Sequence, residues 1–337
     1  MSRTGTVAGR RPRPGNPWAS APLRTVRANG LDVAYLELGS GPLALCLHGF
    51  PDSPFTWRHL MPQLAAAGYR AVAPFSRGYA PTSVPADGAY QLGALMADAE
   101  ALHDALGADD QAVVIGHDWG ASVAYAVAAH SPERWRRIVG MGVPPGDPMA
   151  AGFFDYEQLK QAFYMFLCQT QLAELAFAAG DLAVVDGLWR DWAPGYDAAE
   201  DARHAKACLR PPRSLTAVIG YQRAAFDPHL HQPRYRTRED ASARQPLRPV
   251  CYLHGGADSR LGATMVPAVE RWLGATGRTH VLPGLGHFLH LEDPGQVNRL
   301  ILEWLDDRSV DPTCSTAAEQ VLPTDAPRAC VPSGRFQ

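Results

Sequence analysis

Three residues of this chain have the types and spacing to form and hydrolyse a covalent ester. Residues 116–120 read Gly-His-Asp-Trp-Gly, between an apolar run and a helical pattern. The two glycines allow a sharp strand-to-helix turn, which lifts Asp118 toward a helix N-terminus where backbone N–H groups favour negative charge. Asp118 is therefore our candidate nucleophile. The alternative is that Asp118 only caps the following helix, because Asp is a favoured N-cap residue.

An acid and a base follow Asp118, each on a loop after a predicted strand. Asp258 comes shortly after the apolar run 250–253, and His287 comes shortly after the run 279–282. The chain order nucleophile, acid, histidine is one that such strand-to-helix turns use. We therefore predict that Asp258 is the acid and His287 the base.

Other residues compete for these two roles. His280 lies within a predicted strand and His290 lies three residues past His287, whereas Gly286 gives His287 the close backbone approach that such a loop needs. Asp147 follows an earlier strand and is the reserve acid.

Two backbone N–H groups are candidates for stabilising an oxyanion. Residues 45–51 read Leu-Cys-Leu-His-Gly-Phe-Pro at the end of a predicted strand, where the second donor of an oxyanion hole is expected. The donors would be the amides of Phe50 and Trp119. His48, at the strand end, is interpreted as a structural hydrogen-bonding residue.

The chemistry follows from these side chains. A carboxylate with a reference pKa of about 3.9 is ionised at neutral pH, so it can attack an sp³ carbon without help from a base. His287 would then deprotonate a water that attacks the ester carbonyl, while Asp258 orients the imidazole.

Composition narrows the classes of partner. The chain has 337 residues, 46% hydrophobic and 19% charged, with a formal net charge of −3. There is no basic field for nucleic acid and no apolar run of the ~18 residues that span a bilayer, which favours a cytoplasmic protein with a small-molecule partner. The six cysteines lack metal-ligand spacing and are interpreted as reduced thiols, so we expect neither metal nor cofactor. A homodimer is left open.

Short strand-like runs alternate with helical patterns, which is typical of an α/β fold with a mostly parallel sheet and helices on both faces. Between about 144 and 244 the strand signal disappears and the pattern becomes helical, which predicts an inserted helical cap. The predicted strands are 31–38, 43–48, 69–74, 111–115, 137–143, 250–253 and 279–282. The predicted helices are 54–67, 90–106, 121–129, 157–175, 182–192, 214–225, 265–273 and 296–305. The predicted divisions are tails at 1–22 and 308–337, a core at 23–146 and 243–307, and the cap at 147–242.

The motifs together resemble the epoxide hydrolase branch of the α/β-hydrolase superfamily, over about residues 24–306. The matching text is at 48–51 (His-Gly-Phe-Pro), 116–120, 254–258 (His-Gly-Gly-Ala-Asp) and 286–288 (Gly-His-Phe). The Asp-Trp pair after Gly-His is the most specific element, because esterases and lipases of this fold carry Ser there.

The resemblance also implies two cap tyrosines that hold the epoxide oxygen. Tyr164 matches the first, whereas the second position holds Gln222, with Tyr221 one residue early. The implied reaction converts an apolar epoxide to a vicinal diol, with Tyr164 as the proton donor. The predicted substrate-binding residues are Phe50, Trp119, Tyr164, Tyr221 and Gln222.

Rival functions differ at particular residues. A haloalkane dehalogenase would share the three catalytic residues and use the Trp119 indole as one halide donor, but Phe50 offers no side-chain donor and Trp189 or Trp192 would have to supply the second. A fluoroacetate dehalogenase would need Arg in place of Trp119. A catalytically weak small-molecule-binding relative is the alternative from another class.

Overall fold

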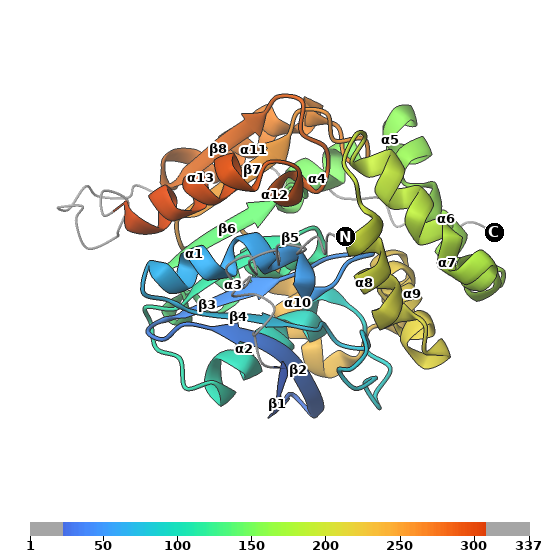
Figure 1. Cartoon of the computed structure of the whole chain (residues 1–337), viewed down its shortest axis with the longest axis horizontal. Helices are drawn as coiled ribbons and strands as arrows, with labels where there is room; N and C mark the ends of the chain where they lie inside the picture. Colours follow the sequence, from blue (N-terminus) through green and yellow to red (C-terminus); the bar gives the residue numbers. More distant parts are fainter. Residues whose placement is uncertain (1–22, 308–337) are drawn as a thin grey trace, which may run out of the picture.

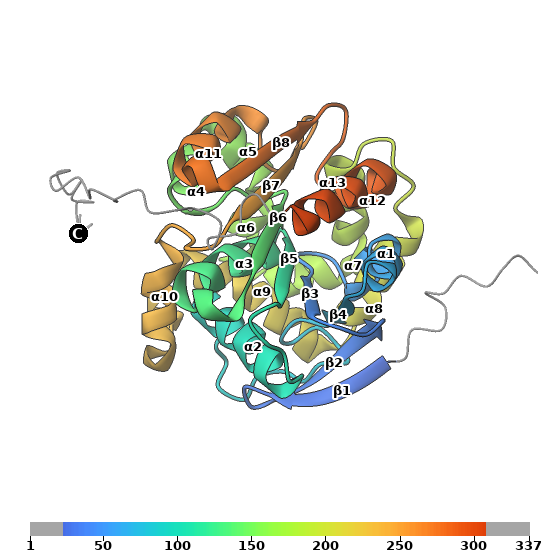
Figure 2. The ribbon, with the colours of Figure 1, turned by 90° about the vertical axis from the view of Figure 1, so that its left-hand side faces the viewer.

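The sheet of this protein has eight strands, and seven of them run in the same direction. The structure is a computed structural model that describes residues 23–307. The strand order is β1-β2-β4-β3-β5-β6-β7-β8, and only the β1–β2 and β2–β4 pairs are antiparallel within the described residues. Figures 1 and 2 show helices on both sides of this twisted sheet. The predicted α/β architecture with a mostly parallel sheet is confirmed.

The strands lie close to the predicted runs, with one addition at the start. The hairpin partner β1 was not predicted, because its LRTVRA sequence is mostly exposed and carries no clear alternation. The bounds are β1 Leu23–Ala28, β2 Leu31–Leu38, β3 Leu43–Leu47, β4 Arg70–Pro74, β5 Val113–His117, β6 Arg137–Met141, β7 Val250–Gly255 and β8 Gly277–Leu282.

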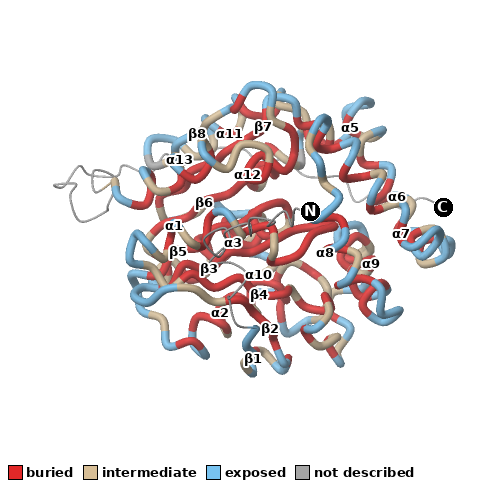
Figure 3. The backbone as a smooth tube through the Cα atoms, viewed as in Figure 1, coloured by how far each residue is buried: buried red, intermediate tan, exposed pale blue. Residues whose placement is uncertain are grey.

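The central strands are buried on both faces, which explains why they read as continuous apolar runs. In β5, Val113 and Ile115 belong to the apolar cluster that contains residues of α1 and α13, whereas Val114 belongs to the cluster on α2 and α3. Figure 3 shows this buried backbone through the middle of the sheet. The core helices are α1 Met61–Ala66, α2 Leu92–Ala105, α3 Trp119–His130, α11 Val266–Leu273, α12 Leu289–Glu292 and α13 Pro294–Asp306.

Residues 147–242 contain helices and no strand, as the sequence predicts. Figure 1 shows α5 to α9 together on one side of the sheet, whereas α10 packs against α2 and α3 of the core. The helices are α4 Gly146–Gly152, α5 Tyr156–Gln161, α6 Phe163–Cys168, α7 Ala173–Trp192, α8 Ala199–Leu209, α9 Pro212–Phe226 and α10 Arg236–Ser242.

The helix boundaries in this segment differ from the predicted ones. The predicted helix 157–175 is divided into α5, α6 and the first residues of α7, and α8 was not predicted. Within α7, residues 179–182 leave the helical conformation, with Gly180 at φ 58°, so its second half begins close to the predicted start at residue 182. A pattern of apolar residues identifies helical segments here but not their breaks, because it does not report backbone changes such as the ψ of 10° at Ala162 or the positive φ at Gly180.

In the described part of the chain, no helix combines the length and the apolar character needed to cross a membrane. The two predicted tails, 1–22 and 308–337, lie outside the described residues.

Candidate active site

Asp118 occupies the sharp turn between β5 and α3. Its φ of 53° and ψ of −116° are unusual for a residue with a side chain, and such backbone strain is characteristic of functional turns. A Cβ atom on Gly116 would lie 2.0 Å from the Gly120 carbonyl oxygen, and one on Gly120 would lie 2.0 Å from the Leu47 carbonyl oxygen. The turn therefore requires both glycines.

The two oxygens of Asp118 have different environments. Oδ1 accepts a 2.8 Å hydrogen bond from the Phe50 amide, which is one of the two predicted oxyanion donors. Oδ2 lies 3.6 Å from His287 Nε2 and 3.3 Å from Arg260 Nε. The carboxylate is buried, so Oδ1 is held by the backbone while Oδ2 faces the ionisable groups. Trp119, the other predicted donor, is the first residue of α3.

His287 is held from three directions. Its Nδ1–H donates a 2.8 Å hydrogen bond to Asp258 Oδ2, and its backbone N–H donates to the Trp192 carbonyl at 2.8 Å. Its own carbonyl accepts a 2.9 Å bond from His117 Nε2. Because Nδ1 is bound to Asp258, Nε2 points toward Asp118. The structure thus brings Asp118, Asp258 and His287 together, whereas Asp147 is exposed on α4.

The charges at this site determine the protonation states. Burial alone would lower the pKa of His287, but the negative charges of Asp258 and Asp118 outweigh burial and raise that pKa to about 9. Burial alone would raise the pKa of Asp118, but Arg260, followed by His287, outweighs burial and holds it well below the ordinary value. The resting site therefore pairs an ionised Asp118 with a protonated His287.

Arg260 is a site residue that the sequence did not reveal. It is buried, and its guanidinium carbon lies 5.9 Å from the ring centroids of Tyr164 and of Trp192. The Asp258 carboxylate accepts the Arg260 backbone N–H at 2.8 Å, which fixes the start of this side chain. The only signal in the sequence is that Arg260 comes two residues after the predicted acid.

Tyr164 on α6 lies over Phe50, whose amide is a predicted oxyanion donor. Its ring stacks on Phe50 at a centroid distance of 5.5 Å and meets Trp192 edge-on at 5.1 Å. Burial raises the pKa of the Tyr164 phenol, and the positive charge of Arg260 opposes this increase. The predicted proton donor is therefore in the same buried aromatic group as the Phe50 that binds Asp118.

Gln222 and Tyr221 on α9 have contrasting surroundings. The Gln222 side chain is fully buried, and neither its amide oxygen nor its amide nitrogen has a hydrogen-bond partner among the described residues. The Tyr221 hydroxyl donates a 2.8 Å bond to the Arg77 carbonyl, and its ring meets Trp119 edge-on at 5.6 Å. The Tyr221 hydroxyl thus has a partner within the protein, whereas the buried amide of Gln222 has none among the described residues.

The comparisons with known proteins place this arrangement in a family. A family model described as alpha/beta hydrolase fold matches residues 42–294. The chain belongs to the α/β-hydrolase superfamily. Epoxide hydrolase A of Mycobacterium tuberculosis is 30% identical over 316 residues, covering 84% of this chain and 96% of that protein. Bifunctional epoxide hydrolase 2 of Sus scrofa is 27% identical over 309 residues, covering 84% of this chain and 55% of that protein.

A solved structure agrees with these relatives. The crystal structure of epoxide hydrolase A from Mycobacterium thermoresistibile matches with a TM-score of 0.69 at 27% identity, covering 85% of this chain and 98% of that one. Because relatives and a structural neighbour named epoxide hydrolases match most of this chain, this α/β-hydrolase is a hydrolase enzyme.

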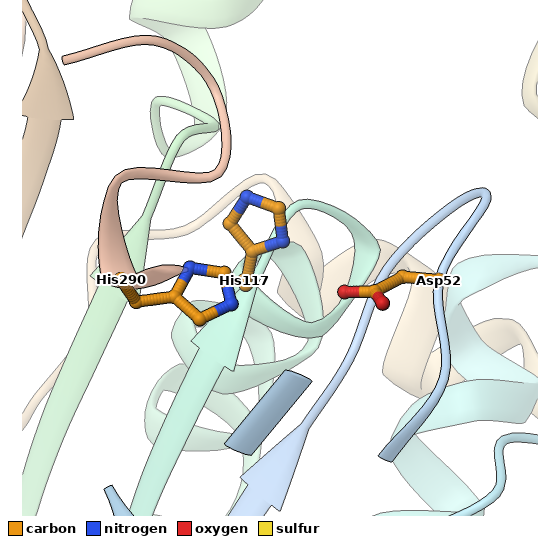
Figure 4. A group of neighbouring side chains, drawn as sticks. All are labelled: Asp52, His117 and His290. Atoms are coloured by element: carbon orange, nitrogen blue, oxygen red, sulfur yellow. The ribbon is translucent and has the colours of Figure 1, made fainter. Parts of the chain in front are cut away.

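This α/β-hydrolase has a second buried polar group, formed by Asp52, His117 and His290. Figure 4 shows the two imidazoles beside each other with the Asp52 carboxylate facing them. Their potential ligand atoms lie within 4.8 Å of one another, so the residue types would suit a small divalent cation. Burial lowers the pKa of both histidines, and His290 Nε2 is 2.5 Å from Thr56 Oγ1. His290 is therefore turned away from Asp118, and His287 alone of the two contacts it.

Trp189, a candidate halide donor, and His48 both form hydrogen bonds within the protein. The Trp189 indole N–H donates a 2.8 Å bond to the Pro51 carbonyl, so it is not available to a halide. The Ser76 amide donates to His48 Nε2 at 3.1 Å, and His48 Nδ1 donates to the Gly49 carbonyl at 2.9 Å, which fits the structural role predicted for His48.

Proposed function

We propose that this α/β-hydrolase converts an epoxide to a vicinal diol through a covalent ester on Asp118. The observation that carries this proposal is that the two oxygens of Asp118 have different partners. Oδ1 is bound by the Phe50 amide, while Oδ2 faces His287, which Asp258 orients. The relatives named epoxide hydrolases support the choice of an epoxide over other electrophiles.

In the first step, Oδ2 of Asp118 attacks an epoxide carbon and the carbon–oxygen bond of the ring breaks. Negative charge leaves Asp118 and develops on the epoxide oxygen, which then takes the phenolic proton of Tyr164. A phenol suits this role because it can donate a hydrogen bond first and a proton afterwards. Gln222 would donate only a hydrogen bond, since a carboxamide does not release a proton at accessible pH.

In the second step, His287 removes a proton from a water that attacks the ester carbonyl. The carbonyl oxygen is Oδ1, which already accepts the Phe50 amide, so the oxyanion forms where a donor is in place. The bond between the carbonyl carbon and the alkyl oxygen then breaks. One proton of the water goes to the diol and the other restores Tyr164. His287 takes back from solvent the proton that it released when the ester formed, so the enzyme returns to its starting state.

In this proposal, the inserted helices α5 to α9 form a cap over the site. They contribute Tyr164, Trp192 and Gln222, whereas the sheet contributes Asp118 and its partners. The haloalkane alternative has less support, because the Trp189 indole already donates to Pro51 and the Phe50 side chain has no donor, so of the candidate second donors Trp192 alone remains. The four described cysteines are free and buried, which supports a reducing compartment such as the cytoplasm; Cys314 and Cys330 lie outside the described residues.

The test is to trap the ester with His287→Gln. The variant keeps Asp118 and should be alkylated by styrene oxide, but it should release the diol at least ~10²-fold more slowly, since a general base contributes about that much. Mass spectrometry should then find the peptide containing Asp118 heavier by one substrate. His280→Gln, on the half-exposed face of β8, is the matched control and should not accumulate the adduct. If the variant is inactive and its Asp118 peptide stays unmodified while the wild type turns over, the proposal is wrong.

A further inference from the structure

The proposed first step moves a negative charge from one buried side chain to another. Asp118 is a carboxylate before the attack and a neutral ester after it, while Tyr164 gives its proton to the epoxide oxygen and becomes a phenolate. Both residues are only 1% exposed. Phe50 and Trp192 pack against the Tyr164 ring, so a phenolate there has little hydration and needs a cation or hydrogen-bond donors in place of water.

At the positions that match the family's two tyrosines, the cap offers one phenol. The second position holds Gln222, and the hydroxyl of the neighbouring Tyr221 already donates to the Arg77 carbonyl at 2.8 Å. A carboxamide can donate a hydrogen bond but cannot supply a proton at accessible pH. In the proposed reaction, the whole charge that leaves Asp118 is therefore carried by Tyr164.

Arg260 is placed beside both positions of this charge. Its Nε lies 3.3 Å from Asp118 Oδ2, and its guanidinium carbon lies 5.9 Å from the centroid of the Tyr164 ring. Burial alone would lower the pKa of Arg260, but the charges of Tyr164, Asp118 and Asp258, in that order, outweigh burial and raise it. Arg260 therefore stays a cation, and it attracts a charge on Tyr164 at least as strongly as one on Asp118.

Asp258 is the other carboxylate near Arg260, and it is already bound on both oxygens. Its Oδ2 accepts from His287 Nδ1, and its Oδ1 accepts from the backbone amides of Arg260 and Leu261. Because these bonds do not involve the Arg260 side chain, Asp258 does not take the place of Asp118 when the ester forms. The Arg260 side chain is then free to pair with the group that has gained the charge.

The other ionisable groups around Tyr164 add no net charge. Burial raises the pKa of the Cys168 thiol on α6 to about 12, so this thiol is neutral at neutral pH. On the helices α9 and α7, which pack against α6, Arg223 pairs with Glu174 at 2.7 Å and the two charges offset each other. The charges that act on Tyr164 are thus those of Arg260 and Asp118.

We propose that Arg260 is the counter-ion for the whole alkylation step, paired with the Asp118 carboxylate in the free enzyme and with the Tyr164 phenolate in the ester. The inference rests on the proposed function. Arg260 gives up no proton: the carboxylate becomes an ester, the carbon–oxygen bond of the epoxide breaks, and the phenolic proton goes to the new hydroxyl. In this way a cation makes up for the absence of a second phenol at Gln222.

The proposal predicts that Tyr164 becomes easier to ionise when the ester forms. Burial and the negative charge of Asp118 raise the pKa of the Tyr164 phenol, whereas Arg260 lowers it. Alkylation removes the charge of Asp118 and leaves that of Arg260, so the pKa of Tyr164 should fall. Without Arg260, burial acts on the phenol alone and this pKa should stay high.

The experiment measures the ionisation of Tyr164 in the trapped ester. His287→Gln is treated with styrene oxide until mass spectrometry finds one substrate on each Asp118 peptide. It is then mixed rapidly to a series of pH values, and the ultraviolet absorbance of tyrosinate is compared with that of the unalkylated variant. Tyrosinate should appear at a lower pH in the ester. Adding Arg260→Gln should raise the midpoint in the ester by about 1 to 3 pH units, the effect of an opposite charge within about 4 to 6 Å.

Three variants, each in the His287→Gln background and brought to the same ester content, serve as controls. Tyr164→Phe should lack the additional tyrosinate, which assigns the signal to Tyr164. Arg260→Lys keeps a cation and should keep part of the fall in the midpoint. Arg210→Gln removes an exposed cation paired with Asp181 and should leave the midpoint unchanged.

The outcomes distinguish this inference from the proposed function. If the ester forms and its tyrosinate midpoint is the same with and without Arg260→Gln, the inference is wrong and epoxide hydrolysis stands. Should Arg260→Gln fail to fold or to form the ester, the His287→Gln variant alone still decides, because tyrosinate that appears at no lower pH in its ester than in its free form also overturns the inference. If no ester forms on Asp118 while the wild type turns over, the proposed function fails and the inference fails with it.

Discussion

The pKa of His287 should change during the catalytic cycle, and the size of the change can be worked out from the site. In the resting enzyme the charges of Asp258 and Asp118 raise this pKa to about 9, so His287 is protonated at neutral pH and cannot act as a base. Alkylation neutralises Asp118, whose Oδ2 lies 3.6 Å from His287 Nε2. The loss of this partner should release the proton and prepare His287 for the hydrolytic step.

Coulomb's law gives the expected magnitude. A unit charge at the 3.6 Å separation contributes roughly 1 kcal/mol in a water-like dielectric and roughly 5 kcal/mol at an effective dielectric constant of about 20. At about 1.36 kcal/mol for each pH unit, the midpoint for ester breakdown should lie about one to three pH units below that of the free enzyme. Ester breakdown should accelerate as pH rises through this lower midpoint, because deprotonated His287 is the active form.

Two measurements compare the titration midpoint of His287 in the free enzyme with that in the ester. NMR titration of the histidine rings, with the His287 signal assigned by its absence in His287→Gln, reports the free enzyme. Quenched single-turnover experiments at a series of pH values report the decay of the ester on the Asp118 peptide. The control His280→Gln should leave the decay profile unchanged. Equal midpoints in the two measurements would refute the reasoning, since Asp118 would then not be the group that is neutralised.

Two further substitutions test the cap residues. Tyr164→Phe should slow ester formation by ~10² to 10⁴-fold, the range of a general acid, without slowing ester breakdown. Quenched-flow kinetics measures both rates, with the exposed Tyr156→Phe as control. An unchanged rate of ester formation would exclude Tyr164 as the acid. Gln222→Tyr should accelerate epoxide opening by up to about 10²-fold, because a second phenol can donate a proton. If a variant shown to be folded by circular dichroism opens the epoxide no faster than the wild type, position 222 is not the place of a second proton donor.

The sequence predicted the residues whose roles depend on local geometry. The position of Asp118 on a sharp turn could be predicted because that turn excludes side chains at 116 and 120, and glycine is the only residue without one. Asp258 and His287 follow strands β7 and β8, and parallel neighbouring strands bring such loops to one edge of the sheet. These are consequences of chain order and backbone sterics, which a sequence displays directly.

Arg260 was missed because its place depends on tertiary packing. An arginine is normally exposed, whereas Arg260 is buried with its guanidinium beside Tyr164 of α6 and Trp192 at the end of α7. The same limit applies to Gln222 and Tyr221, which are neighbours in sequence. One has a committed hydroxyl and the other an unpartnered amide, and nothing in the local sequence distinguishes them.

The central claim is that the substrate is attacked by Asp118 and not directly by water. A single turnover with excess enzyme in ¹⁸O-labelled water tests it, because the two routes place the water oxygen in different molecules. If the ester forms and is cleaved at its carbonyl, the label should appear in the Asp118 peptide while the diol takes an unlabelled oxygen from the enzyme. A labelled diol together with an unlabelled Asp118 peptide would contradict the account.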